Sequence, residues 1–172
     1  MKKLTSWDVY YSLAMAIACA LSYAITTELL GRFVDEPNEL LGGMWAVVAT
    51  VFVFRESRES SLSAGVARLT ATCVSFALCL IYLLLFSVTG IGLAVVIGLG
   101  TIAMMALGRQ DDISTTAITT SVVLVVAAID PEKALLQPLL RLLDTVVGIA
   151  IGMACKWSAS YIFYRAVGEP VR

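Results

Sequence analysis

The sequence predicts an all-α fold: a polytopic membrane helix bundle of six transmembrane helices, built as two inverted three-helix repeats. Three observations support this prediction. Hydrophobic residues make up 59% of the 172 residues and charged residues only 15%, against about 45–50% and 25% in ordinary soluble domains. Six apolar runs approach the length that crosses a bilayer. A short polar signature occurs twice, in the third and the sixth of these runs.

The six predicted spans are joined by short polar connections and form a single membrane domain, residues 1–172. The first is too long for the apolar core of a signal peptide, which has about 7–15 residues, so we interpret it as a span. The second is short for a bilayer core about 30 Å thick, and the fourth and fifth are rich in small or hydroxyl residues, which favours shielding by neighbouring helices. The spans are 9–30, 40–54, 63–88, 91–107, 114–130 and 138–163.

The charges of the connections orient this bundle. With six spans, one side carries Lys2, Lys3, Arg55, Arg58, Arg109, Arg165 and Arg172. The other side has two basic residues among five carboxylates: Arg32, Lys133, Asp35, Glu36, Glu39, Asp130 and Glu132. Basic residues accumulate in cytoplasmic loops, so the pattern predicts that both termini are cytoplasmic.

The repeated signature is Arg68-Leu-Thr-Ala-Thr72-Cys-Val-Ser75 and, 73 positions later, Arg141-Leu-Leu-Asp-Thr145-Val-Val-Gly148. Overlaying the two arginines also brings residues 45–54 of the second span onto residues 118–127 of the fifth. Each repeat then holds three spans, and because three is odd, the second repeat must insert upside down relative to the first. The alternative is a chance coincidence of Arg, Thr and small residues in two amphipathic helices.

The two arginines predict a path for an anion. An arginine within a span costs about 2.5–3.5 kcal/mol on insertion scales, so two at matching positions need a common reason. Residues four apart share one helix face, which places Thr72 beside Arg68 and Thr145 beside Arg141 as hydrogen-bond donors. Two alternatives remain open: the arginines extend to the lipid headgroups, or Asp144 neutralises Arg141 as a structural pair. Asp144 is also the candidate proton-coupling acid.

Other spans contribute weaker candidates. Thr116 and Thr120 stack on one face of the fifth span and are candidate substrate ligands, with bonds to helix carbonyls as the alternative. Trp45 is a candidate aromatic ligand, with anchoring at the membrane interface as the alternative. Gly148 and Gly152 form a GxxxG pattern that predicts close helix packing. We expect Lys156, late in the sixth span, to extend to the headgroups.

The sequence also lacks the patterns of several other protein classes. It has no histidine, no phosphate-binding loop and no G-x-G-x-x-G, so nucleotide-driven or dinucleotide chemistry has no support. The four cysteines lie within spans without C-x-x-C spacing, which argues against metal ligands and disulfides. No hydrolytic triad can be assembled. We therefore expect neither an enzyme nor a bound cofactor, metal or nucleic acid.

The chain resembles the fusaric acid resistance-like and aromatic acid exporter superfamily, to which the plant aluminium-activated malate transporters are related. The resemblance rests on Trp45-Ala-Val-Val-Ala-Thr50, on Arg68-x-x-Ala71-Thr72-x-x-Ser75 and on Arg141-x-x-Asp144-Thr145-x-x-Gly148. It covers essentially the whole chain. Family members typically carry Gly-Thr and a later Gly after the first arginine, whereas this chain has Ala71 and Ser75.

The resemblance implies a multi-pass protein of the bacterial inner membrane that passes aromatic or other small organic carboxylates. Members act as proton-driven exporters in bacteria or as anion channels in plants. Bacterial exporters of this type usually contain two such units and a soluble portion, whereas this chain looks like one unit alone. We therefore expect a homodimer. A membrane scaffold that transports nothing is the remaining alternative.

Overall fold

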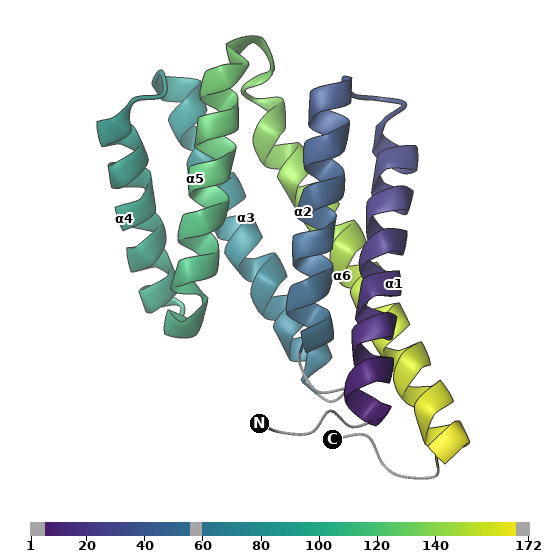
Figure 1. Ribbon diagram of the computed structural model, residues 1–172. Helices are drawn as coiled ribbons and strands as arrows, with labels where there is room; N and C mark the ends of the chain where they lie inside the picture. Colours follow the sequence, from purple (N-terminus) through teal and green to yellow (C-terminus); the bar gives the residue numbers. More distant parts are fainter. Residues whose placement is uncertain (1–5, 56–59, 168–172) are drawn as a thin grey trace, which may run out of the picture. The chain divides into compact units, whose positions relative to one another are not determined.

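The computed structural model describes residues 6–55 and 60–167, and all of their regular structure is helical (Figure 1). This confirms the predicted all-α class, and the inverted repeat stays a prediction. Two short 3-10 turns, η1 (Gln110–Asp112) and η2 (Pro131–Lys133), flank the fifth helix. The six α-helices are α1 (Ser6–Leu30), α2 (Glu36–Arg55), α3 (Ser61–Leu85), α4 (Gly90–Ala106), α5 (Ile113–Ile129) and α6 (Leu136–Val167).

Every predicted span corresponds to one helix, and the largest difference at a start concerns α2. It begins at Glu36 rather than near residue 40, so it has 20 residues and reaches about 30 Å, the thickness of a bilayer core. Acidic side chains stabilise a helix N-terminus, and proline is tolerated in the first turn. Glu36, Pro37 and Glu39 are therefore suited to a first helical turn, although residues of these types are also common in loops.

Five segments of the described chain are long and apolar enough to cross a membrane: Trp7–Leu29, Glu36–Arg55, Ser61–Leu85, Gln110–Ile129 and Leu136–Arg165. The remaining helix, α4, is apolar but shorter, with 17 residues. Thr89 caps the N-terminus of α4, since its hydroxyl oxygen accepts a hydrogen bond from the Gly92 amide at 3.1 Å. These helices form the polytopic bundle that the apolar runs predict.

The contacts within the chain define two compact units. The first unit is Met1–Gly65 with Val146–Arg172, and the second unit is Val66–Thr145. Both α3 and α6 contribute to each unit, since the boundaries fall inside these helices. That the chain forms a single membrane domain stays a prediction, and each unit is described by itself below.

In the first unit, α2 packs against both α1 and α6. Thr50 Oγ1 donates a hydrogen bond to the Gly148 carbonyl oxygen at 2.9 Å and lies 2.8 Å from Ser22 Oγ, so one hydroxyl links three helices. A Cβ at Gly148 would collide with the backbone of Ala46, and one at Gly152 would lie 3.1 Å from Thr50 Cα. The GxxxG pattern therefore serves close packing, as predicted.

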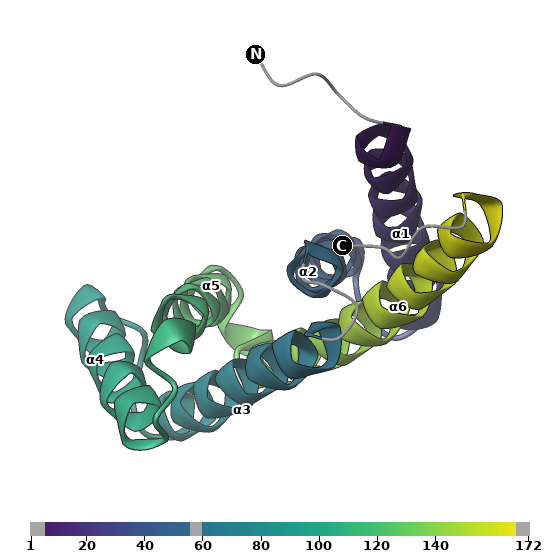
Figure 2. The same cartoon turned by 90° about the horizontal axis from the view of Figure 1, so that it is seen from below.

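The start of α1 also packs against the end of α6 within the first unit (Figure 2). Tyr10 Oη donates to the Ala159 carbonyl at 2.8 Å, and the rings of Trp7 and Phe163 are 4.4 Å apart. Lys156 lies close by with 4% of its surface exposed and its ammonium 4.8 Å from the ring centroid of Tyr11. The expectation that Lys156 extends to the headgroups was wrong, because aromatic rings surround this cation inside the unit.

In the second unit, α5 packs against both α3 and α4. Ser75 Oγ donates to the Thr116 carbonyl at 3.0 Å and lies 3.1 Å from Thr120 Oγ1, which donates to it. Cys79 Sγ is 4.0 Å from the Thr120 carbonyl oxygen. The apolar core of the unit is Cys79, Val96, Val123 and Leu124.

We predict that Gly148→Ala lowers the free energy of unfolding by about 1–3 kcal/mol, because the added methyl group forces α6 away from the backbone of α2. The control is Gly98→Ala on α4, where a Cβ meets nothing within 4 Å and alanine favours the helix by up to about 1 kcal/mol. Thermal unfolding in detergent compares the two variants. Equal midpoints would contradict the close contact of α6 with α2.

Candidate functional site

Both repeated arginines lie inside the molecule. Arg68 on α3 is 3% exposed and Arg141 on α6 is 1% exposed. Each has its threonine partner one turn later: Thr72 Oγ1 donates to the Arg68 carbonyl at 2.9 Å, and Thr145 Oγ1 donates to the Arg141 carbonyl at 2.7 Å. Neither arginine extends to the surface, so the structure does not support the headgroup alternative.

The threonines use their hydroxyl hydrogens within the protein. Besides the two bonds above, Thr116 Oγ1 donates to the Asp112 carbonyl at 3.2 Å and Thr120 Oγ1 donates to Ser75 Oγ. Such bonds to carbonyls one turn earlier are common for threonine inside apolar helices. In this conformation, the four predicted threonine ligands present acceptor lone pairs, and donation to a substrate would require their hydroxyls to rotate.

Arg141 and Asp144 form a buried ion pair within one turn of α6. Arg141 Nη1 is 3.0 Å from Asp144 Oδ2, with the side chains 1% and 0% exposed. Nε and Nη2 of Arg141 and Oδ1 of Asp144 have no hydrogen-bond partner among the described residues. Buried polar atoms are normally satisfied, so a pair with open donors and an open acceptor is suited to further partners.

The buried charge of the second unit is positive. Among the described residues of this unit, the buried charged side chains are two cations and one anion: Arg68, Arg141 and Asp144. Buried charges in folded proteins are normally paired or hydrogen-bonded, so these three side chains are the candidate residues for binding an anion within this unit.

The same unit contains most of the predicted site residues. Arg68, Thr72, Thr116, Thr120, Arg141, Asp144 and Thr145 all fall within Val66–Thr145. Trp45 belongs to the first unit, where it is 2% exposed in the middle of α2. Anchoring at the membrane interface was therefore the wrong alternative for this tryptophan.

Sequence reasoning missed three buried polar residues of the second unit. Thr115 and Thr119 lie one turn apart on α5, with Thr119 Oγ1 donating to the Thr115 carbonyl at 2.9 Å. Gln137 is fully buried on α6, one turn before Arg141. The signal for Gln137 was available, since Gln137, Arg141 and Thr145 continue one helix face at a spacing of four.

A model of the fusaric acid resistance protein-like family matches residues 21–155. The chain belongs to this family. The match extends from α1 into α6 and includes both arginines and Asp144, so the suspected resemblance is confirmed. Neither the curated proteins nor the solved structures contain a match to the chain.

Membership of the fusaric acid resistance protein-like family makes this chain a multi-pass membrane protein of a family concerned with membrane transport and resistance. Arg68, Arg141 and Asp144 lie inside the matched region. Within the described residues, no group of three or more His, Cys, Asp or Glu could hold a metal ion.

We predict that Asp144→Asn lowers the free energy of unfolding by about 3–5 kcal/mol, because it leaves the Arg141 cation buried without its counter-charge. The matched control is Asp112→Asn. Asp112 forms an ion pair of the same i,i+3 spacing with Arg109 at 3.3 Å, but its side chains are 23% and 34% exposed, and such pairs contribute about 0–1 kcal/mol.

Denaturant titration in mixed micelles measures both variants. Replacing the buried pair together, as Arg141→Met with Asp144→Leu, should recover most of the loss, since no charge then remains unpaired. If Asp144→Asn and Asp112→Asn cost the same, the carboxylate of Asp144 does not neutralise Arg141.

Proposed function

We propose that this protein exports small organic carboxylate anions, aromatic ones in particular, across the bacterial inner membrane and that the proton gradient drives the export. One observation carries the proposal: two guanidinium groups and one carboxylate are buried in a single compact unit of a membrane protein. The family name, which refers to resistance to fusaric acid, is consistent with an organic acid as cargo.

The chemistry of arginine suits this cargo. A guanidinium stays charged and offers a planar fork of donors that matches a carboxylate with two parallel hydrogen bonds. Arg68 and Arg141 are the proposed anchors, with Thr72, Thr145, Thr116 and Thr120 of the same unit as polar ligands. The proposal is of a transporter, with no cofactor and no catalytic residue.

The buried ion pair supplies a route for coupling. Arg141 can be neutralised by Asp144, as it is here at 3.0 Å, or by the carboxylate of a substrate. When the substrate takes this place, Asp144 loses its partner, and a buried carboxylate without a counter-charge takes up a proton. Exchange of two carboxylates on one guanidinium thus ties a protonation change to each passage of substrate.

The helix contacts support the inverted repeat in this proposal. On α6, Gly148 meets Ala46 and Thr50 of α2; on α3, the matching Ser75 bonds to Thr116 and Thr120 of α5. The next matched positions repeat this, with Gly152 at Thr50 and Cys79 at Thr120.

The contacts also refine the alignment of the two halves. The contacts match Ala46 with Thr116 and Thr50 with Thr120, which are 70 positions apart. The two arginines, in contrast, are 73 positions apart. Residues 45–54 therefore align with residues 115–124 rather than with 118–127. The three additional residues of the second half lie between Thr120 and Arg141. Two halves of opposite orientation would build a pathway with alternately open ends.

The assembly proposed here is a homodimer with both termini cytoplasmic. The family resemblance suggests two copies of a six-helix unit, and the loop charges favour cytoplasmic termini. Its partners are then a second copy, the organic anion and the lipid bilayer. A non-transporting scaffold is the second candidate, favoured by the ion pair of Arg141 with Asp144, which can fix a helix without any ligand.

We predict that Arg68→Gln and Arg141→Gln each weaken anion binding by about 2 kcal/mol, or about thirtyfold, because each removes a desolvated charge contact. The measurement is flux of labelled benzoate in liposomes, with and without a pH difference. Arg165→Gln is the control, since Arg165 is exposed in the last turn of α6.

Three outcomes separate the candidates. Loss of flux in both site variants, together with acceleration of wild-type flux by a pH difference, supports the coupled exporter. Flux that follows the anion gradient and ignores pH indicates a homodimeric anion channel. Equal flux in wild type and in the double variant refutes the site.

A further inference from the structure

A hollow of about 480 Å³ lies along the end of α1 and the turn after it, within the first unit. Its lining residues come from one short segment: Ala24, Ile25, Glu28, Leu29, Arg32 and Phe33. They fall into two stripes at a spacing of four. One stripe carries Glu28 and Arg32, and the other is apolar, so the hollow is amphipathic.

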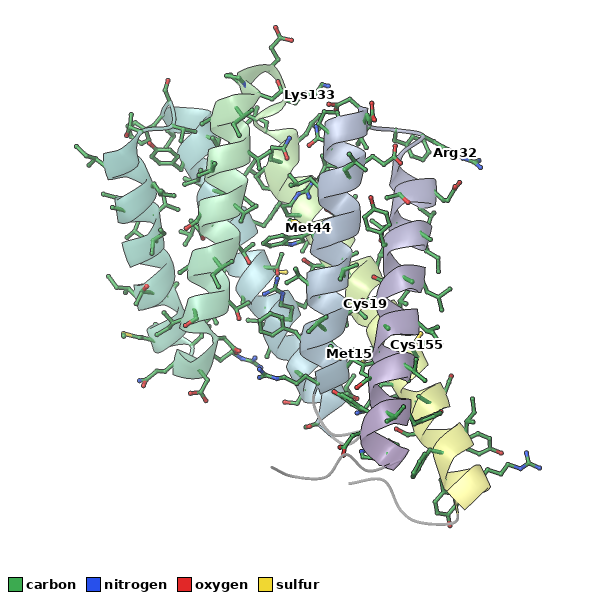
Figure 3. All side chains as sticks on the ribbon, viewed as in Figure 1. Met15, Cys19, Arg32, Met44, Lys133 and Cys155 are labelled. Atoms are coloured by element: carbon green, nitrogen blue, oxygen red, sulfur yellow. The ribbon has the colours of Figure 1, made fainter. Side chains whose placement is uncertain are left out.

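The two charges of this hollow are exposed and separate. Opposite charges four residues apart on a helix often pair. Glu28 and Arg32, however, form no ion pair or hydrogen bond through their side chains among the residues that the structure describes. Figure 3 shows the labelled Arg32 extending away from the helices. A carboxylate and a guanidinium are thus both available beside an apolar surface.

The hollow lies where the membrane surface is expected. The membrane-spanning part of α1 ends at Leu29, so Glu28 and Arg32 fall at the level of the lipid headgroups. Phe33 is 82% exposed, and aromatic residues are enriched at this interface. Ile25 and Leu29 extend the apolar stripe toward the bilayer core.

We propose that this hollow binds a phospholipid with an ethanolamine headgroup. Its ammonium would contact Glu28 and its phosphate Arg32, with the headgroup lying along the helix and an acyl chain against Ile25 and Leu29. A primary ammonium donates hydrogen bonds to a carboxylate, and arginine binds phosphate oxygens with its fork of donors.

The surrounding charge selects a zwitterionic lipid over an anionic one. The turn and the start of α2 add Asp35, Glu36 and Glu39, so carboxylates outnumber the guanidinium of Arg32 at this end of the first unit. The carboxylate of Glu39 lies against Gly31, the residue that precedes Arg32 in the chain. A lipid with net negative charge is repelled there, whereas an ethanolamine lipid brings a cation to these acids.

Native mass spectrometry of the full-length protein tests this site. The protein is equilibrated with equal amounts of dioleoyl phosphatidylethanolamine and dioleoyl phosphatidylglycerol, and the retained lipids are counted. We expect the ethanolamine lipid to be retained preferentially, and Glu28→Gln or Arg32→Gln to reduce its retention about tenfold, since each removes a charge-assisted hydrogen bond.

The matched control is Glu132→Gln, which removes an exposed carboxylate of η2 in the second unit, outside the hollow, and should keep the preference. Thermal unfolding of each variant checks that the fold is unchanged. Equal retention of the two lipids by the wild type would overturn the proposal. Equal losses in Glu132→Gln and Glu28→Gln would overturn it as well, because general surface charge would then explain the preference.

Discussion

The structure depends on one electrostatic constraint: a guanidinium buried in an apolar molecule needs a compensating charge. Arg141 has Asp144 at 3.0 Å. At the matching position of α3, three residues after Arg68, the chain has the fully buried Ala71. The second unit thus buries two guanidinium groups and one carboxylate. Because burial removes water from these groups, each depends strongly on the charges and hydrogen bonds around it, and the proposed anionic ligand would act on them in this setting.

Small side chains and hydroxyls make this burial possible. Gly148 lets α6 approach the backbone of α2, and Thr50 bonds across the same contact. In the second unit, Ser75 and Thr120 hold α3 against α5. Between membrane helices, packing and hydrogen bonds replace the hydrophobic driving force, so these residues position the helices that carry the arginines. The threonines thus have a structural use whether or not a substrate contacts them.

Much of the fold was predictable because apolar length is a strong signal. The six predicted apolar runs correspond to the six α-helices. The family resemblance rested on motifs that include both arginines. The start of α2 was missed because Glu36 and Pro37 also suit a loop, and only the first-turn preference distinguishes the two. Burial was harder to predict. Lys156 was expected at the headgroups, and anchoring at the interface was one alternative for Trp45, yet both pack inside the first unit, since neighbouring helices decide exposure.

The most direct test of the central claim is a distance between cargo and guanidinium. Solid-state NMR can measure it with carboxyl-¹³C benzoate and guanidinium-¹⁵N arginine in lipid-reconstituted protein. We predict a carbon–nitrogen distance of about 4 Å, set by hydrogen bonds of about 2.7–2.9 Å between nitrogen and oxygen, and its loss in the variant with both Arg68→Gln and Arg141→Gln. A signal that persists in that variant, or bound benzoate with no nearby arginine, would contradict the account.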